Sequence, residues 1–84
     1  MSINQTKSSN EKITALLVEA LHVSSDQVSI DLQFGDLPQW DSMGHMEVMI
    51  LLEERFGVEI NPDTIAELTS VPAIRDFIEG NQHD

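Results

Sequence analysis

Three polar residues near the middle of the chain, Asp41, Ser42 and His45, have the side chains of a hydrolase triad. In such a triad a histidine takes the serine proton, an acid orients the histidine, and preorganised donors stabilise the oxyanion. The spacing argues against this chemistry, because His45 lies one turn along the same predicted helix and points alongside Ser42 rather than back at its hydroxyl. The sequence also lacks the G-x-S-x-G turn of many serine hydrolases. We therefore expect Ser42 not to be a catalytic nucleophile.

The acidic residues around this segment do not predict a metal site. Asp31, Asp36 and Asp41 are spaced by five residues, whereas an EF-hand loop needs oxygen ligands that begin at every second position and a glycine at the middle of the loop. The chain contains no cysteine, which excludes a disulfide framework and a cysteine-based zinc site. We expect no metal in this protein.

Ser42 directly precedes the most apolar helical stretch of the chain, which we predict to run to about Phe56 and to end at Gly57. As the N-cap of that helix, Ser42 would accept a backbone hydrogen bond worth about 1 kcal/mol. A helix start also offers free N–H groups and the positive end of the helix dipole. A phosphate esterified to the Ser42 hydroxyl would therefore be stabilised at this position.

The predicted helix that follows Ser42 has two distinct faces at about 100° per residue. The expected core face consists of Val48, Met49, Leu52 and Phe56. A second face, which we call the docking stripe, consists of Met43, Glu47, Ile50 and Glu54. This mixture of apolar and acidic side chains suits a basic partner that has an apolar pocket. The alternative is a helix buried on all sides, with the two glutamates reaching past their neighbours into solvent.

The remaining apolar residues predict three more helices. The first is expected over residues 10–22, with Asn10 as its N-cap, and its apolar face consists of Ile13, Leu16, Leu17, Ala20 and Leu21. Asn61 and Pro62 predict the start of a short helix that ends near Leu68. A last helix follows Ser70 and is expected to end at Gly80. Its apolar face consists of Val71, Ile74, Phe77 and Ile78.

The segment between the first two helices alternates apolar and polar residues, which is typical of a half-buried strand. No second strand is available to pair with it, so its backbone groups would be unsatisfied. We therefore expect a long extended loop, pinned to the core by Val28, Ile30, Phe34 and Leu37. The predicted fold is a small all-α four-helix bundle with three longer helices and one short one. Residues 10–80 form the domain, and residues 1–9 and 81–84 are expected to be flexible ends.

The chain is strongly acidic, with 15 acidic and four basic residues and a formal net charge of −11. This charge repels nucleic acid and anionic membranes and favours basic protein surfaces, although it would also simply keep a small protein in solution. No segment has the apolar length of a membrane span, and the start MSINQTKSSN lacks the apolar core of a secretion signal. We expect a cytoplasmic monomer that binds neither nucleic acid nor membranes.

The residues around Ser42 resemble those of the acyl carrier proteins and their peptidyl and aminoacyl relatives. Asp41-Ser42-Met43 opens an acidic helix, LLEERFGVEI follows at residues 51–60, and LTSV follows an Asn-Pro helix start at residues 68–71. A D-S-M triplet alone is a weak signal, but this combination is specific and covers residues 10–80.

The resemblance implies that Ser42 is the attachment point of 4′-phosphopantetheine, which a separate magnesium-dependent phosphopantetheinyl transferase transfers from coenzyme A. The arm ends in a thiol that holds an acyl or related group as a thioester. The resemblance also implies that Asp41 helps the transferase to recognise the site. The docking stripe would contact acyl ligases, acyltransferases or synthases that have basic docking patches. The protein would then be an acyl carrier and not itself an enzyme.

Some residues depart from the pattern of carriers in primary fatty acid synthesis. Gly44 stands where those carriers usually have an acid, and it costs about 1 kcal/mol of helix propensity relative to alanine. Arg55 interrupts the acidic run, and Trp40 is more similar to specialised carriers, including D-alanyl and polyketide-type ones. The cargo is therefore open between fatty acyl, polyketide and aminoacyl or peptidyl groups. A different class also stays open, namely an acidic helical interaction module in which Ser42 is only a helix cap.

Overall fold

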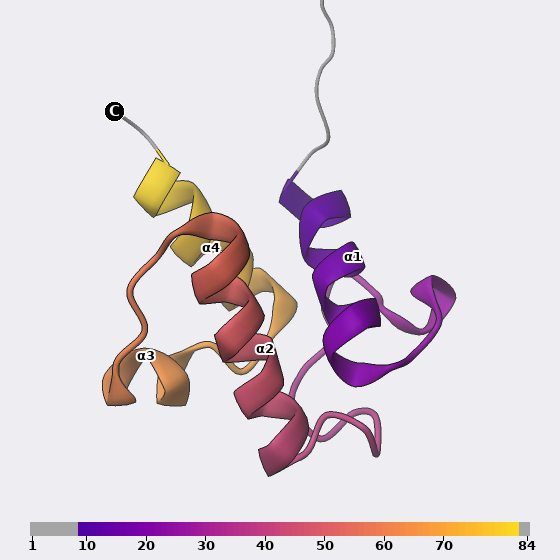
Figure 1. The fold of residues 1–84 in the computed structure, drawn as a ribbon. Helices are drawn as coiled ribbons and strands as arrows, with labels where there is room; N and C mark the ends of the chain where they lie inside the picture. Colours follow the sequence, from indigo (N-terminus) through magenta and orange to yellow (C-terminus); the bar gives the residue numbers. More distant parts are fainter. Residues whose placement is uncertain (1–8, 83–84) are drawn as a thin grey trace, which may run out of the picture.

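The computed structural model describes residues 9–82, which form a small helical bundle (Figure 1). The helices are α1 (Ser9–Leu21), α2 (Ser42–Phe56), α3 (Pro62–Glu67) and α4 (Val71–Gln82), and a short 3₁₀ helix, η1 (Ser25–Gln27), lies in the first connection. This confirms the predicted all-α four-helix bundle with one short helix. None of the helices within residues 9–82 has the length and apolar character needed to cross a bilayer.

Helix α1 packs against both α2 and α4, and these two helices run in the opposite direction to it (Figure 1). The short helix α3 lies to one side, below the end of α2 (Figure 1). The start of α1 and the end of α4 lie at the same end of the bundle, whereas the start of α2 lies at the other end (Figure 1). Ser42, the first residue of α2, is therefore remote from the ends of the described chain.

The predicted apolar faces of the three longer helices meet in the core. The buried members of these faces are Ile13, Leu16, Leu17, Ala20, Leu21, Val48, Met49, Leu52, Val71, Ile74 and Ile78. Phe56 and Phe77 are only partly buried and pack against the edge of this core. The predicted apolar faces thus hold the helices together. A chain of this size needs most of its apolar residues for its core, because a small domain buries only a limited part of its surface.

The helix ends agree with the sequence at some positions and differ at others. Asn61 caps α3 by accepting a hydrogen bond from the Thr64 N–H at 2.9 Å, and Gly57 ends α2 in a left-handed conformation (φ 65°). Asn10 is not an N-cap, because α1 already begins at Ser9. Gly80 does not end α4, which continues to Gln82. The rest of the predicted flexible ends, residues 1–8 and 83–84, lies outside the described residues.

The loop between α1 and α2 packs against the core through a set of residues that differs in part from the predicted one. Val28 is buried and Leu37 is partly buried, as predicted, but Ile30 is 66% exposed and Phe34 is 41% exposed. The buried side chains are instead those of Leu32 and Trp40. The expectation assumed a regular alternation of inward and outward residues, but the chain turns at residues 30–31 and again at 34–35, so the alternation does not persist.

The same loop is fastened to the connection between α3 and α4. Gln33 forms an isolated antiparallel bridge with Ser70. On either side of it, the Phe34 N–H donates to the Thr69 carbonyl and the Val71 N–H donates to the Leu32 carbonyl, both at 2.8 Å. These bonds satisfy the backbone groups of a segment that has no strand partner, and they hold Phe34 beside α3.

Candidate functional site

Helix α2 is capped by Asp41, not by Ser42 as predicted. Asp41 has an extended backbone, and its Oδ1 accepts a hydrogen bond from the Gly44 N–H at 2.9 Å. Aspartate and serine are comparable N-caps, but a carboxylate also interacts favourably with the positive end of the helix dipole. Asp41 therefore supplies the cap, and Ser42 becomes the first helical residue.

The Ser42 side chain is exposed, and its hydroxyl makes no hydrogen bond to another residue within the described part of the chain. It stands at the N-terminus of a 15-residue helix, where backbone N–H groups and the helix dipole favour an anion. The position therefore has room for a substituent on the hydroxyl, and the capping role that would have occupied the oxygen is taken by Asp41.

Gly44 is required by a close approach of the preceding loop to α2. A Cβ atom at this position would lie 2.2 Å from the Gln39 carbonyl oxygen and 2.9 Å from Leu21 Cδ2. The carbonyl belongs to the backbone and cannot rotate away as a flexible side chain can. The sequence suggested that Gly44 only lowers helix propensity, whereas in the structure it lets the loop that carries Trp40 and Asp41 pack directly against α2.

We expect Gly44→Ala to lower the free energy of unfolding by about 1–3 kcal/mol, because the added methyl group forces the loop and α2 apart. Helix propensity alone would change the stability in the other direction. Gly80→Ala is the matched control, since Gly80 is also helical and an added Cβ would meet no atom within 4 Å. This control should stabilise the protein by about 0.5–1 kcal/mol. Urea unfolding of both variants measures the difference, and stabilisation by Gly44→Ala would show that the close approach is not needed.

His45 is a buried link between three parts of the fold. It is only 6% exposed, and its Nδ1 accepts a hydrogen bond from the Nε1–H of the fully buried Trp40 at 3.0 Å. Its Nε2 lies 2.8 Å from the Ile65 carbonyl oxygen. Because an indole only donates and a carbonyl only accepts, the two bonds require a neutral ring with its proton on Nε2. His45 thereby joins the loop, α2 and α3 behind Ser42.

The hydrogen bonds of His45 also argue against a catalytic triad of Asp41, Ser42 and His45. Both ring nitrogens of His45 are engaged by Trp40 and Ile65, so neither is free to take the Ser42 proton. The role of His45 was missed in the sequence, where it was considered only as a triad member. Its position one turn before Val48 places it on the core face of α2, and that periodicity could have identified it as buried.

An apolar hollow of about 360 Å³ opens beside Ser42, between the first loop, α2 and α3. Its lining residues are Phe34, Ser42, His45, Met46, Ile65, Ala66 and Thr69. The ring of Phe34 meets that of His45 edge to face, with centroids 5.5 Å apart and an interplanar angle of 85°. A group attached to Ser42 would thus have an apolar surface next to it.

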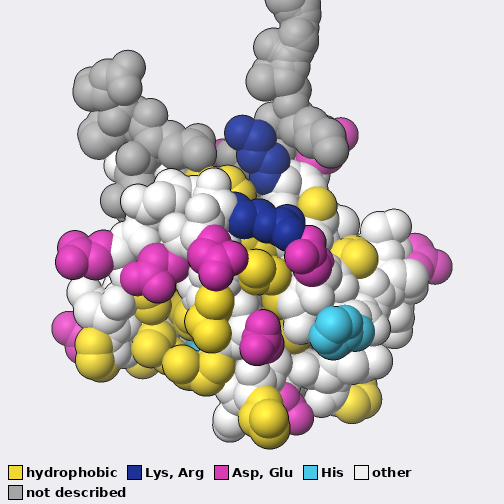
Figure 2. Space-filling model, in the orientation of Figure 1, with side chains coloured by type: hydrophobic (Ala, Val, Ile, Leu, Met, Phe, Trp, Pro, Cys, Tyr) yellow, Lys and Arg dark blue, Asp and Glu magenta, His cyan; other side chains and the backbone are white. Residues whose placement is uncertain are grey.

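The docking stripe lies on the surface of α2. All four of its residues are exposed, Met43 to 81% and Ile50 to 44%, so the alternative of a helix buried on all sides is wrong. On the face of the bundle that Figure 2 shows, hydrophobic side chains gather over the lower part, acidic side chains lie among and above them, and cationic side chains lie higher still. Arg55 is engaged in an ion pair with Glu19 of α1. The use of this stripe by partners stays a prediction.

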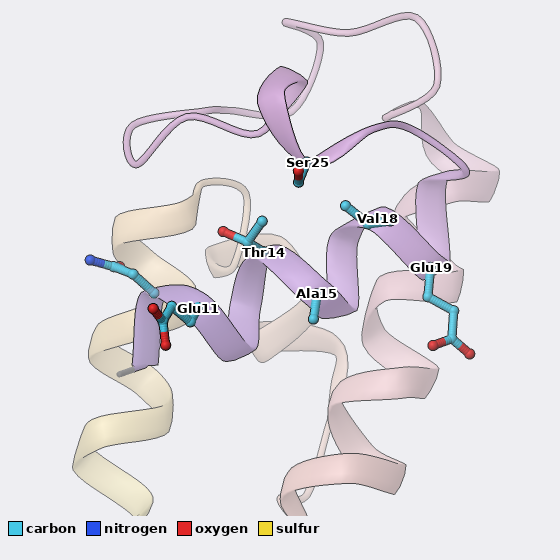
Figure 3. Close-up of a pocket in the computed structure, with 7 residues that line it drawn as sticks. Glu11, Thr14, Ala15, Val18, Glu19 and Ser25 are labelled. Carbon is cyan, nitrogen blue, oxygen red and sulfur yellow. The ribbon is translucent and has the colours of Figure 1, made fainter. Parts of the chain in front are cut away.

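A second hollow, of about 480 Å³, lies along the outer face of α1 and shares no residue with the hollow beside Ser42. Thr14 and Val18 point across it toward Ser25, while Glu11 and Glu19 lie at its margins (Figure 3). Within residues 9–82, no group of three or more histidine, aspartate or glutamate side chains is arranged to hold a metal ion.

Comparison with known protein families identifies the family of the chain. The family described as "Phosphopantetheine attachment site" matches residues 11–78, which is more than half of the chain and includes Ser42. The exposed serine hydroxyl at a helix N-terminus is a chemically suitable acceptor for a phosphate ester. The chain thus belongs to the phosphopantetheine attachment-site family, whose members are non-catalytic carriers with a covalently attached 4′-phosphopantetheine.

Proposed function

We propose that the protein is an acyl carrier in which 4′-phosphopantetheine is attached to Ser42 Oγ through a phosphate ester. The observation that carries the proposal is the Ser42 side chain, which is exposed, free of hydrogen bonds within the described residues and located at the first position of α2. The arm supplies a terminal thiol for thioester formation, a group that a chain without cysteine does not contain.

The residues around Ser42 have separate roles in this proposal. Asp41 holds the first turn of α2 in place through its bond to the Gly44 N–H, which fixes the direction of the Ser42 Cα–Cβ bond. The helix dipole stabilises the negative phosphate. The hollow lined by Phe34, Met46 and Ile65 offers mainly apolar surface, and this supports an acyl group as cargo over a charged aminoacyl group.

The test is to incubate the protein with coenzyme A, magnesium and a broad-specificity phosphopantetheinyl transferase and then to weigh the intact protein. A gain of one phosphopantetheine per chain, located on the Ser42 peptide by fragmentation, is expected. No gain in mass would favour the helical interaction module, in which the same surface binds one partner without a prosthetic group. The mass of the arm and cargo on protein isolated from its native host would then distinguish acyl from aminoacyl or peptidyl groups.

We propose that partner enzymes with basic patches bind the docking stripe beside the arm. The double variant Glu47→Lys, Glu54→Lys should lower the kcat/KM of a cognate acyl ligase or synthase by about tenfold at low salt, because an attractive surface becomes repulsive. The loss should shrink as salt is added. Glu59→Lys, Glu79→Lys is the matched control, because it makes the same charge change at exposed positions outside the stripe. Equal losses in the two double variants would show that only net charge matters.

A further inference from the structure

His45 belongs both to the lining of the hollow beside Ser42 and to the contacts of the core. It lines the hollow, and its Nδ1 accepts a hydrogen bond from the Trp40 Nε1–H. Trp40 has no exposed surface and belongs to the core cluster. A group that enters the hollow from Ser42 therefore lies next to the His45 ring, which is bonded to a core side chain.

The His45 ring is fixed in this position by its own bonds. Moving it would break the bonds to the buried Trp40 N–H and to the part-buried Ile65 carbonyl and leave both groups without these partners. Each such group costs about 1–3 kcal/mol. The edge of the hollow is also held, because the Phe34 N–H donates to the Thr69 carbonyl at 2.8 Å and both residues line the hollow. Both the His45 ring at the bottom of the hollow and the backbone of Phe34 and Thr69 at its edge are thus held by hydrogen bonds.

We propose that His45 keeps a cargo carried on Ser42 out of the core by closing the bottom of the hollow beside Ser42. This inference rests on the proposed function, since it assumes a group carried from Ser42. The hollow measures about 360 Å³, near the lower end of the range for small-molecule pockets. Short acyl groups are covered by it, whereas longer ones extend along the surface into solvent and do not pass His45 into the bundle.

Trp40 is the only tryptophan of the chain and lies directly behind His45, so its fluorescence reports whether cargo enters the core. The test loads the wild-type protein with acetyl-, hexanoyl- and dodecanoyl-phosphopantetheine from the corresponding coenzyme A thioesters. Intact mass establishes the loading first. The emission maximum of Trp40 should be the same for all three cargoes. A shift in the wild type that grows with chain length would overturn the proposal.

His45→Ala should open the bottom of the hollow. In this variant the emission maximum should shift with chain length, and the dodecanoyl form should have a higher Tm than the acetyl form. Ile65→Ala is the matched control, because it shortens a wall of the hollow while keeping the backbone carbonyl and the His45 ring. Its Trp40 emission should stay independent of chain length. A folded His45→Ala protein with the same emission for every cargo would contradict the role of His45.

Two further arms separate this inference from the proposed function and from a failure of the variant to fold. Failure of loading by mass would count against Ser42 as the attachment residue. In that case the unmodified wild type is titrated with free S-hexanoyl- and S-dodecanoyl-pantetheine, and the emission maximum of Trp40 is measured again. A shift with the longer thioester would contradict the proposal that His45 closes the hollow. If His45→Ala is unfolded by circular dichroism, the wild-type comparison alone decides.

Discussion

Replacement of Ser42 by alanine should abolish attachment of phosphopantetheine and leave the fold intact. Loss of the hydroxyl removes the only atom of this residue that can form the phosphate ester, so the mass gain should fall from one arm per chain to none. The stability should change by no more than about 0.5 kcal/mol, because Ser42 is exposed and the cap of α2 comes from Asp41. Intact mass after the transferase reaction and urea unfolding are the two measurements.

Asp41 provides the comparison for this result. Asp41→Ala should lower the stability by about 1 kcal/mol through loss of the cap to the Gly44 N–H, while Asp41→Asn should keep the cap without the charge. If the transferase recognises the carboxylate, Asp41→Asn should be modified more slowly than the wild type at unchanged stability. A Ser42→Ala protein that still gains one arm would refute the attachment site. If Ser42→Ala lost as much stability as Asp41→Ala, the assignment of Asp41 as the cap of α2 would be refuted.

Val48→Asp should unfold the domain. Val48 has no exposed surface, and a carboxylate there would be buried among apolar side chains without a partner. We expect a loss of at least about 4 kcal/mol, which is most of the stability of a bundle this small. Loss of the helical circular dichroism signal in buffer, or a large fall in Tm, is the expected observation.

Ile50→Asp is the matched control for this variant. It places the same charged side chain on the same helix, two residues further on, but on the docking stripe, where Ile50 is 44% exposed. The stability should change by about 0.5 kcal/mol or less. A native melting curve for Val48→Asp, or unfolding by Ile50→Asp, would mean that the faces of α2 are assigned incorrectly.

The sequence alone identified the features that depend on neighbours within a few residues. The buried faces of α1, α2 and α4 follow from apolar periodicity, and Asn61 and Gly57 mark helix ends through their own conformational preferences. The motif around Ser42 indicated the carrier family, which the match over residues 11–78 confirms. The prediction of Ser42 as the cap of α2 was wrong, because serine and aspartate cap helices about equally well and the sequence does not distinguish Ser42 from Asp41.

Only the tertiary structure decided how distant segments meet around Ser42. The link from Trp40 through His45 to the Ile65 carbonyl joins residues 25 positions apart. The first loop is also paired with Thr69 and Val71, which lie far along the chain. The need for glycine at position 44 likewise depends on where the loop and α1 pack. Periodicity and capping preferences describe one helix at a time, whereas these contacts depend on the relative placement of several elements. For that reason the carrier motif was visible in the sequence, but the hollow that would receive its cargo was not.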